Sequence, residues 1–150
     1  MKKLFFVLLA TSYFVACKTE DKKSSEQPPL TQEQKEAALK DSSKFTSILW
    51  LDSTVLSMGK IKKGAEIEVA YRFKNTGTHP LIFDRVDPQC GCTMSEVPQR
   101  PYAPGEEGVI KSKFNSGSQQ IGEHRKYISV TANTKPSYTS LQFNVEVTEQ

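Results

Sequence analysis

The clearest pattern in the chain is an alternation of apolar and polar side chains downstream of residue 47. Between residues 66 and 74 the apolar side chains fall on every second position, and charged side chains occupy most of the positions between them. A period of two places successive side chains on opposite faces of a β-strand. We therefore predict a strand with one buried face, formed by Ile67, Val69, Tyr71 and Phe73.

Weaker alternation predicts further strands on both sides of this one. A first strand is expected around Ile48, Trp50, Leu51, Val55 and Leu56, broken at Asp52-Ser53 and followed by a connection over residues 58–64. The next is expected to begin at Pro80 and end at Asp87-Pro88. Later strands are predicted over residues 107–114, 127–132 and 141–147, and a proline-rich loop over residues 95–104.

Six or seven short strands separated by turns, with no long helical period among them, indicate an all-β fold. The expected architecture is an antiparallel β-sandwich of about seven strands, in which one face of each sheet packs on the other sheet. A chain of 150 residues has room for one such domain, and we place it at residues 47–150.

The first residues have the pattern of a targeting segment. Lys2 and Lys3 precede an apolar run over residues 4–15, which is too short to span a bilayer, and the small Ala16 precedes Cys17. The sequence at 14–17 resembles a bacterial lipobox. We therefore predict a lipoprotein signal peptide at residues 1–16 and lipid attachment at Cys17. The alternative is an ordinary signal peptide with an incidental cysteine.

The segment between Cys17 and the first strand is polar and mixed in charge. It has almost no large apolar side chains and cannot bury enough surface to offset the entropy of ordering. Residues 17–46 are therefore predicted to be the lipidated cysteine and a flexible tether. Thr31 and Gln34 resemble a helix capping box, so a short and marginal helix is expected there.

Charge argues against a nucleic-acid partner. The net charge is +3, but Lys2 and Lys3 belong to the predicted signal peptide, and the remaining 18 Lys and Arg nearly balance 17 Asp and Glu. A near-neutral domain lacks the basic surface that binds a phosphate backbone. We expect the membrane, through the lipid, and an envelope protein of unknown identity as the partners.

Cys90 and Cys92 are the strongest candidates for a chemical role, and three interpretations of them compete. They are structural, either packed as thiols or joined across Gly91 in a strained and easily reduced disulfide that requires a bend in the chain. Alternatively, Cys90, Cys92 and Met94 share a strand face and bind a soft metal such as Cu(I), with His79 or His124 as further ligands. Thiol exchange is the third interpretation, and it is disfavoured because no helix is predicted after Cys92.

Other polar residues favour ordinary structural roles. His79 is expected in a solvated turn, His124 on a charged strand edge and Trp50 in the core, and Glu106-Glu107 is expected to be a solvated turn edge. The sequence contains no HExxH, GxSxG, P-loop or dinucleotide-binding motif. We therefore expect a non-enzymatic protein without a cofactor, with copper as the alternative.

Several short blocks in order resemble a known family. They are Met58-Gly59-Lys60-Ile61, Asn75-Thr76-Gly77, Pro80-Leu81, Cys90-Gly91-Cys92-Thr93 and Pro104-Gly105-Glu106. Together they are similar to domain-of-unknown-function family fifteen seventy-three, although Met58 replaces a common Phe. The resemblance implies an immunoglobulin-like fold and an envelope lipoprotein of Gram-negative bacteria, with no established function. Its motif residues are Asn75, Gly77, Gly91, Thr93, Pro104 and Gly105.

These observations give one functional expectation. The chain is expected to be a lipid-anchored module of the cell envelope that contacts another protein through its sheet edges or through the loop of residues 90–104. Lys18 follows Cys17, where the familiar enterobacterial signal for inner-membrane retention has Asp, so the outer membrane is favoured over the inner membrane.

Overall fold

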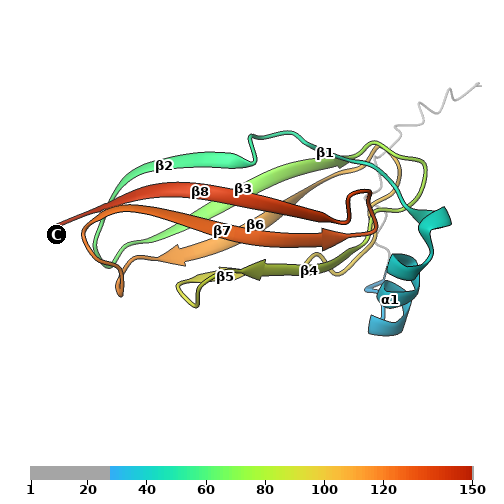
Figure 1. The fold of residues 1–150 in the computed structure, drawn as a ribbon, viewed down its shortest axis with the longest axis horizontal. Coiled ribbons are helices and arrows are strands. Elements are labelled where there is room, and N and C mark those ends of the chain that lie inside the picture. The colour runs from blue at the N-terminus through green and yellow to red at the C-terminus, as the bar shows by residue number, and fades with distance from the viewer. Residues whose placement is uncertain (1–27, 150) are drawn as a thin grey trace, which may run out of the picture.

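Two four-stranded sheets pack face to face in the computed structural model, which describes residues 28–149 (Figure 1). The first sheet has the order β1-β3-β6-β5 and the second has the order β2-β8-β7-β4. The first comprises β1 (Ile48–Trp50), β3 (Glu66–Asn75), β6 (Glu107–Asn115) and β5 (Thr93–Ser95); the second comprises β2 (Val55–Lys62), β8 (Tyr138–Thr148), β7 (Gly122–Ala132) and β4 (Phe83–Pro88). The predicted all-β sandwich is confirmed, with eight strands in the described range.

Strand pairing differs from the prediction in the N-terminal third of the domain. The pairs β3–β6 and β7–β8 are antiparallel, as expected, but β2 runs parallel to β8. The expected first strand is in fact two strands in different sheets, because the chain crosses from one sheet to the other at Asp52-Ser53. The expected connection at 58–64 lies mostly within β2, where a register shift between Ser57 and Lys60 interrupts the alternation.

The core lies between the two sheets and is rich in aromatic side chains. Phe73 packs edge-to-face against Phe83 and against Tyr102, with ring centroids 4.9 Å apart in each pair. Phe114 and Phe143 form a further pair at 5.5 Å. Burying one such side chain stabilises the fold by roughly 1.5–3 kcal/mol. The alternation identified in the sequence therefore points into one continuous core.

The C-terminal part of the predicted tether is folded rather than flexible. Helix α1 (Gln32–Lys40) and the short 3-10 helix η1 (Ser42–Lys44) lie at one end of the sandwich, near β4 (Figure 1). The predicted capping box is present, because Gln34 N donates to Thr31 Oγ1 (3.3 Å) and Thr31 N donates to Gln34 Oε1 (2.9 Å). The tether prediction was wrong for these residues because tertiary packing stabilises a helix that is marginal in isolation.

Two kinds of contact attach this segment to the domain. Ala38 and Lys35 are buried, and the Lys35 ammonium donates to Gln99 Oε1 at 3.1 Å. Leu30 N also donates to Gln99 O at 3.1 Å. Neither helix in the described range is long and apolar enough to cross a membrane. The predicted signal peptide and Cys17 lie outside the described residues.

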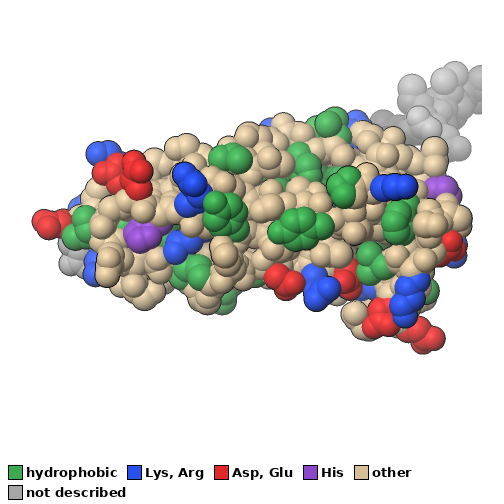
Figure 2. Space-filling model, viewed as in Figure 1, with side chains coloured by type: hydrophobic (Ala, Val, Ile, Leu, Met, Phe, Trp, Pro, Cys, Tyr) green, Lys and Arg blue, Asp and Glu red, His purple; other side chains and the backbone are tan. Residues whose placement is uncertain are grey.

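The surface carries charges of both signs. On the face shown in Figure 2, Lys and Arg side chains alternate with Asp and Glu, while separate hydrophobic side chains lie along the middle of the sandwich. Eight ion pairs join opposite charges within the described residues. This face has no extended patch of a single sign.

Candidate functional site

The turn of residues 90–93 connects β4 to β5 and so carries the chain from one sheet to the other. Cys90 and Cys92 are joined by a disulfide, with Cα atoms 5.3 Å apart, inside the usual range for bridged cysteines. Thr93 N donates to Cys90 O at 3.2 Å and closes the turn. Of the structural alternatives, the structure therefore has the disulfide, with Gly91 in the bend that it requires.

The Thr93 side chain lies beneath this disulfide. It is buried, and its hydroxyl oxygen is 3.7 Å from Cys90 Sγ and 3.8 Å from Cys92 Sγ. Sulfur atoms in a disulfide carry no proton, so the Thr93 hydroxyl is the donor in these contacts. A buried hydroxyl directed at both sulfurs is the feature of this turn that the sequence did not reveal, because the sequence identified Thr93 only as a motif residue.

Met94 does not share the environment of the two cysteines. Its side chain is 65% exposed, whereas Cys92 packs partly against the core. The expected common face for three sulfurs was therefore wrong, because the turn at Cys92 ends before β5 begins at Thr93. Both cysteine sulfurs are held in the disulfide, so copper binding stays a prediction for the reduced protein only.

Neither histidine joins the cysteine pair as a cluster. His79 Nδ1 is 3.2 Å from the Thr78 hydroxyl, and His124 Nε2 is 2.6 Å from Gln120 O. In residues 28–149, no group of three or more His, Cys, Asp and Glu side chains is arranged to hold a metal ion.

The Asn-Thr-Gly and Pro-Gly-Glu motifs meet at the α1 end of the sandwich. The side chain of Asn75 is fully buried; its amide nitrogen donates to His79 O (2.8 Å) and Tyr102 O (2.9 Å), and its oxygen accepts from Thr46 Oγ1 (2.8 Å) and Gly77 N (3.1 Å). The main chain of Asn75 bonds to Gly105 and Glu106. The Asn-Thr-Gly and Pro-Gly-Glu blocks therefore form one structural network.

Glycine is required at positions 77 and 105 for different structural reasons. A Cβ on Gly77 would overlap Thr46 Oγ1 and lie 2.5 Å from Ser47 N, so the close approach of two chain segments requires its absence. Gly105 follows Pro104 in the turn before β6 and has a φ of +81°, which side chains rarely adopt. Both positions serve the fold.

The carboxylates of Glu106 and Glu107 are each paired with a cation, whereas a solvated turn edge was expected. Glu106 is 2.6 Å from Arg100 Nη2, and Glu107 is 3.2 Å from Lys74 Nζ. Partial burial opposes ionisation of Glu106, but hydrogen bonds from Arg100 and from Ala103 N outweigh it and lower the pKa of this carboxyl. Trp50 was expected in the core; it is partly buried and packs against the core, with its ring centroid 6.1 Å from that of Phe73.

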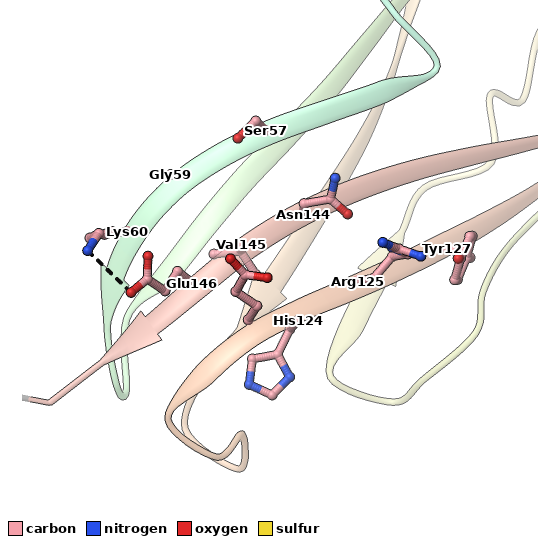
Figure 3. Close-up of a pocket in the computed structure, with 10 residues that line it drawn as sticks. Ser57, Gly59, Lys60, His124, Arg125, Tyr127, Asn144, Val145 and Glu146 are labelled. Atoms are coloured by element: carbon pink, nitrogen blue, oxygen red, sulfur yellow. Dashed lines mark ion pairs between the residues drawn. The ribbon is translucent and has the colours of Figure 1, made fainter.

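A shallow hollow of about 680 Å³ lies on the outer face of the second sheet (Figure 3). It is bordered by β2, β8 and β7, with Lys60 and Glu146 paired at 3.3 Å along one side. Its lining residues are Ser57, Gly59, Lys60, Glu123, His124, Arg125, Tyr127, Asn144, Val145 and Glu146. The sequence indicated the polar face of β8, but it missed the hollow because β2 was taken for a connection.

A second cavity of about 450 Å³ lies between the N-terminal helices and the start of β4. It is lined by Ala38, Ser43, Lys44, His79, Pro80, Ile82 and Asn133. Asn133 is buried, and its side chain donates to Lys44 O (3.1 Å) and Pro80 O (2.9 Å). The cavity therefore lies at the contact between the N-terminal segment and the sandwich.

Solved structures show a similar fold at low sequence identity. A crystal structure of a protein of unknown function from Porphyromonas gingivalis W83 has a TM-score of 0.61 and 19% identity, covering 71% of this chain and 49% of that chain. The chain thus spans about half the length of that protein. The PapD-like domain of human CEP192 has a TM-score of 0.52 and 12% identity, covering 85% of this chain and 96% of that domain. At these identities the likeness shows the fold alone.

The sequence itself matches one family model. Residues 49–147 match the model described as "Protein of unknown function (DUF1573)", and this range contains the folded domain almost completely. No curated protein matches the chain. The expectation of this family from the motifs is therefore confirmed.

Proposed function

Since the chain belongs to the DUF1573 family of proteins of unknown function, we propose that it is a non-enzymatic, lipid-anchored module of the cell envelope that binds another protein. The observation that carries the protein contact is a row of exposed aliphatic side chains where the chain crosses between the sheets. Leu49, Leu51 and Val55 are 50%, 37% and 48% exposed.

The backbone at this crossing is also open to a partner. β1 is an edge strand of the first sheet and β2 is an edge strand of the second, so each pairs on one side only within the described residues. An extended segment of another protein can add to such an edge through main-chain hydrogen bonds and place apolar side chains on the exposed row. We propose an extended segment of this kind, with apolar side chains, as the occupant.

Site-specific crosslinking in the native envelope tests this contact. A photo-reactive residue placed at Leu49 or Val55 should give one discrete crosslinked product, whereas the same residue at Asp87, on the opposite edge strand β4, should give none. Leu51→Asp should abolish the product while the purified variant keeps its fold. Equal crosslinking at Asp87, or no product at any of the three positions, would overturn the contact.

The anchor is supported by the sequence of residues 1–17 alone. A thioether-linked diacylglycerol and an amide-linked acyl chain supply more than the two hydrophobic anchors that stable attachment needs, and the outer membrane is favoured because Lys18 follows Cys17. Cys17→Ala should leave the protein uncleaved or without lipid, and intact mass should place the wild-type N-terminus at a modified Cys17. A mature N-terminus at any other residue contradicts the anchor.

The non-enzymatic part of the proposal has its own test. It is supported by the roles of the candidate carboxylates, because Glu106 and Glu107 are each paired with a cation at a turn edge. A purified protein that turned over a substrate, and lost this turnover on Cys90→Ser, would overturn it. Substrate screening with wild type and Cys90→Ser is the measurement.

A further inference from the structure

The disulfide between Cys90 and Cys92 is not needed to hold its turn. The turn is closed by the bond from Thr93 N to Cys90 O, and it is fixed to β6 because Asn115 N donates to Cys92 O at 2.9 Å. In the chain-entropy model, the stabilisation from a disulfide grows with the length of the loop that it closes. A bridge across a single residue closes one of the shortest loops available and so contributes little to the fold.

One side of the disulfide is open to solvent. Gly91 is exposed, its φ is not in the left-handed region, and a Cβ built on it meets no atom within 4 Å outside the neighbouring Cys90 and Cys92. The glycine is therefore required neither by backbone conformation nor by crowding, and Cys90 and Cys92 on either side of it are both partly exposed. Cys92 packs against the core cluster, whereas Cys90 is not part of that cluster. An incoming thiolate therefore meets Cys90 first.

The buried side of the disulfide carries a hydrogen-bond donor. The Thr93 hydroxyl lies within 3.8 Å of both sulfurs, which are its hydrogen-bond partners. A thiolate packed on apolar side chains is destabilised unless a donor faces it. Thr93 supplies that donor to whichever sulfur is released. In other thiol-exchange proteins a helix N-terminus stabilises the thiolate in this way.

We propose that Cys90 and Cys92 form a reversible dithiol–disulfide pair that exchanges with a dithiol protein of the envelope, with Thr93 as the positioning residue. The proposal rests on the envelope location proposed above for its partner and for the oxidised resting state. A thiolate of the partner attacks Cys90 Sγ, the bond to Cys92 Sγ breaks, and the Cys92 thiolate leaves towards the Thr93 hydroxyl.

The exchange is completed by the second thiol of the partner. It attacks the partner sulfur of the mixed disulfide and releases Cys90, so that the partner becomes a disulfide. Two electrons and two protons pass from the partner dithiol to the cysteine pair, and the reverse steps reoxidise it. One electron pair is exchanged per encounter, and no substrate is turned over.

Equilibration with glutathione tests reversibility. The full chain carrying Cys17→Ser, in which only these two thiols remain, is equilibrated at pH 7 with a series of reduced-to-oxidised glutathione ratios, alkylated and weighed intact. We expect the pair to change from fully bridged to fully reduced within the series and to return when the ratio is reversed. A bridge that survives the most reducing mixture, as structural disulfides do, or one that fails to re-form, overturns the proposal.

Single substitutions test which sulfur is attacked. In the same background, Cys92→Ser leaves only Cys90, and Cys90→Ser leaves only Cys92. With oxidised glutathione as the probe, we expect the mixed disulfide to form at least tenfold faster on Cys90 than on Cys92. Equal rates, or faster reaction at Cys92, overturn the assignment of Cys90 as the exchanging sulfur.

Thr93 is tested by the pH dependence of the same reaction. In the Cys92→Ser protein, Thr93→Val keeps the side-chain shape but removes the donor, and we expect the midpoint of the rate–pH profile to move to higher pH. Thr93→Ser, which keeps the hydroxyl, should restore it. Three coincident profiles would overturn the positioning role. All these reactions take place in solution without a membrane, so their failure is distinguishable from failure of the Cys17 anchor or of the β1–β2 contact.

Discussion

At the residue scale, Asn75 joins more separate parts of the chain than its position at the end of β3 suggests. Its buried amide reaches the N-terminal segment through Thr46, the following turn through Gly77 and the later loop through Tyr102. A buried amide with every group paired fixes one arrangement of these segments, because any other would leave a donor or acceptor unpaired. The Asn-Thr-Gly block is thus explained by folding.

The two motif glycines at 77 and 91 should respond to alanine to different extents. Gly77→Ala forces a Cβ against Thr46 and the Ser47 backbone, and we expect it to lower the free energy of unfolding by about 2–3 kcal/mol. Gly91→Ala places its Cβ in open space, so the change should stay within about 0.5 kcal/mol. Urea denaturation of both variants measures the contrast. Equal losses would mean that Gly91 also serves the fold.

Asp52 should make the stability depend on pH in acid. Its carboxylate accepts hydrogen bonds from the Arg72 side chain (2.7 Å) and from Arg72 N (2.8 Å), and these lower its pKa from 3.8 to about 2. Because the folded pKa lies below the unfolded value, the stabilising contribution is complete above pH 3.8 and is lost as the pH falls towards 2.

Comparison of wild type with Asp52→Asn isolates this contribution. The urea midpoint of wild type should exceed that of the variant at pH 6, and the two midpoints should converge near pH 2, where the wild-type carboxyl is protonating. A difference between the midpoints that is the same at both pH values would show that Asp52 acts through something other than its charge.

At the scale of elements, the alternation of apolar and polar side chains identified the strands that have one solvent-exposed and one buried face. β3, β6 and β8 lie close to their predicted positions because their inward side chains repeat without interruption. The second half of β2 was missed because a register shift breaks its alternation, and the parallel pairing of β2 with β8 depends on partners more than 80 residues away. The stability of helix α1 was underestimated because the apolar side chain that packs it on the domain, Ala38, is small.

The cysteine turn shows the same limit for sites. The sequence could place two thiols one residue apart and require a bend between them. Whether a donor faced the sulfurs depended on which way Thr93 points, and this is set by its pairing opposite Phe114 in β6. The hollow on the outer face likewise arises from three strands that are distant in sequence.

Helix α1 provides a prediction at this scale with a matched control. Ala38→Glu places a charge in the buried contact and should release the helix, so that amide protection in residues 32–40 falls while protection in the sheets persists. Ala37→Glu, one residue away on the exposed face, should leave protection unchanged. Hydrogen exchange with fragment resolution measures both. Unaltered protection in Ala38→Glu would show that α1 does not depend on this contact.

At the scale of the whole molecule, stability resides in the core between the sheets and not in the disulfide. For a bridge spanning three residues, the chain-entropy model gives a contribution of about 1.6 kcal/mol, less than burial of a few core side chains. Cys90→Ser/Cys92→Ser should therefore unfold in one cooperative urea transition with a loss of about 1–2 kcal/mol. A loss above about 4 kcal/mol, or no transition, would make the bridge essential to the fold.

The docked helix also determines how a tethered molecule would stand on a bilayer. With α1 folded onto the sandwich, only residues 18–27 separate Cys17 from the first described residue, and ten residues extend at most about 35 Å. The strand β4 runs away from the α1 end towards residues 90–93 (Figure 1). An acylated Cys17 would thus keep the α1 end of the sandwich close to the lipid. The turn of residues 90–93 would then face away from the bilayer, towards proteins that approach from the aqueous side.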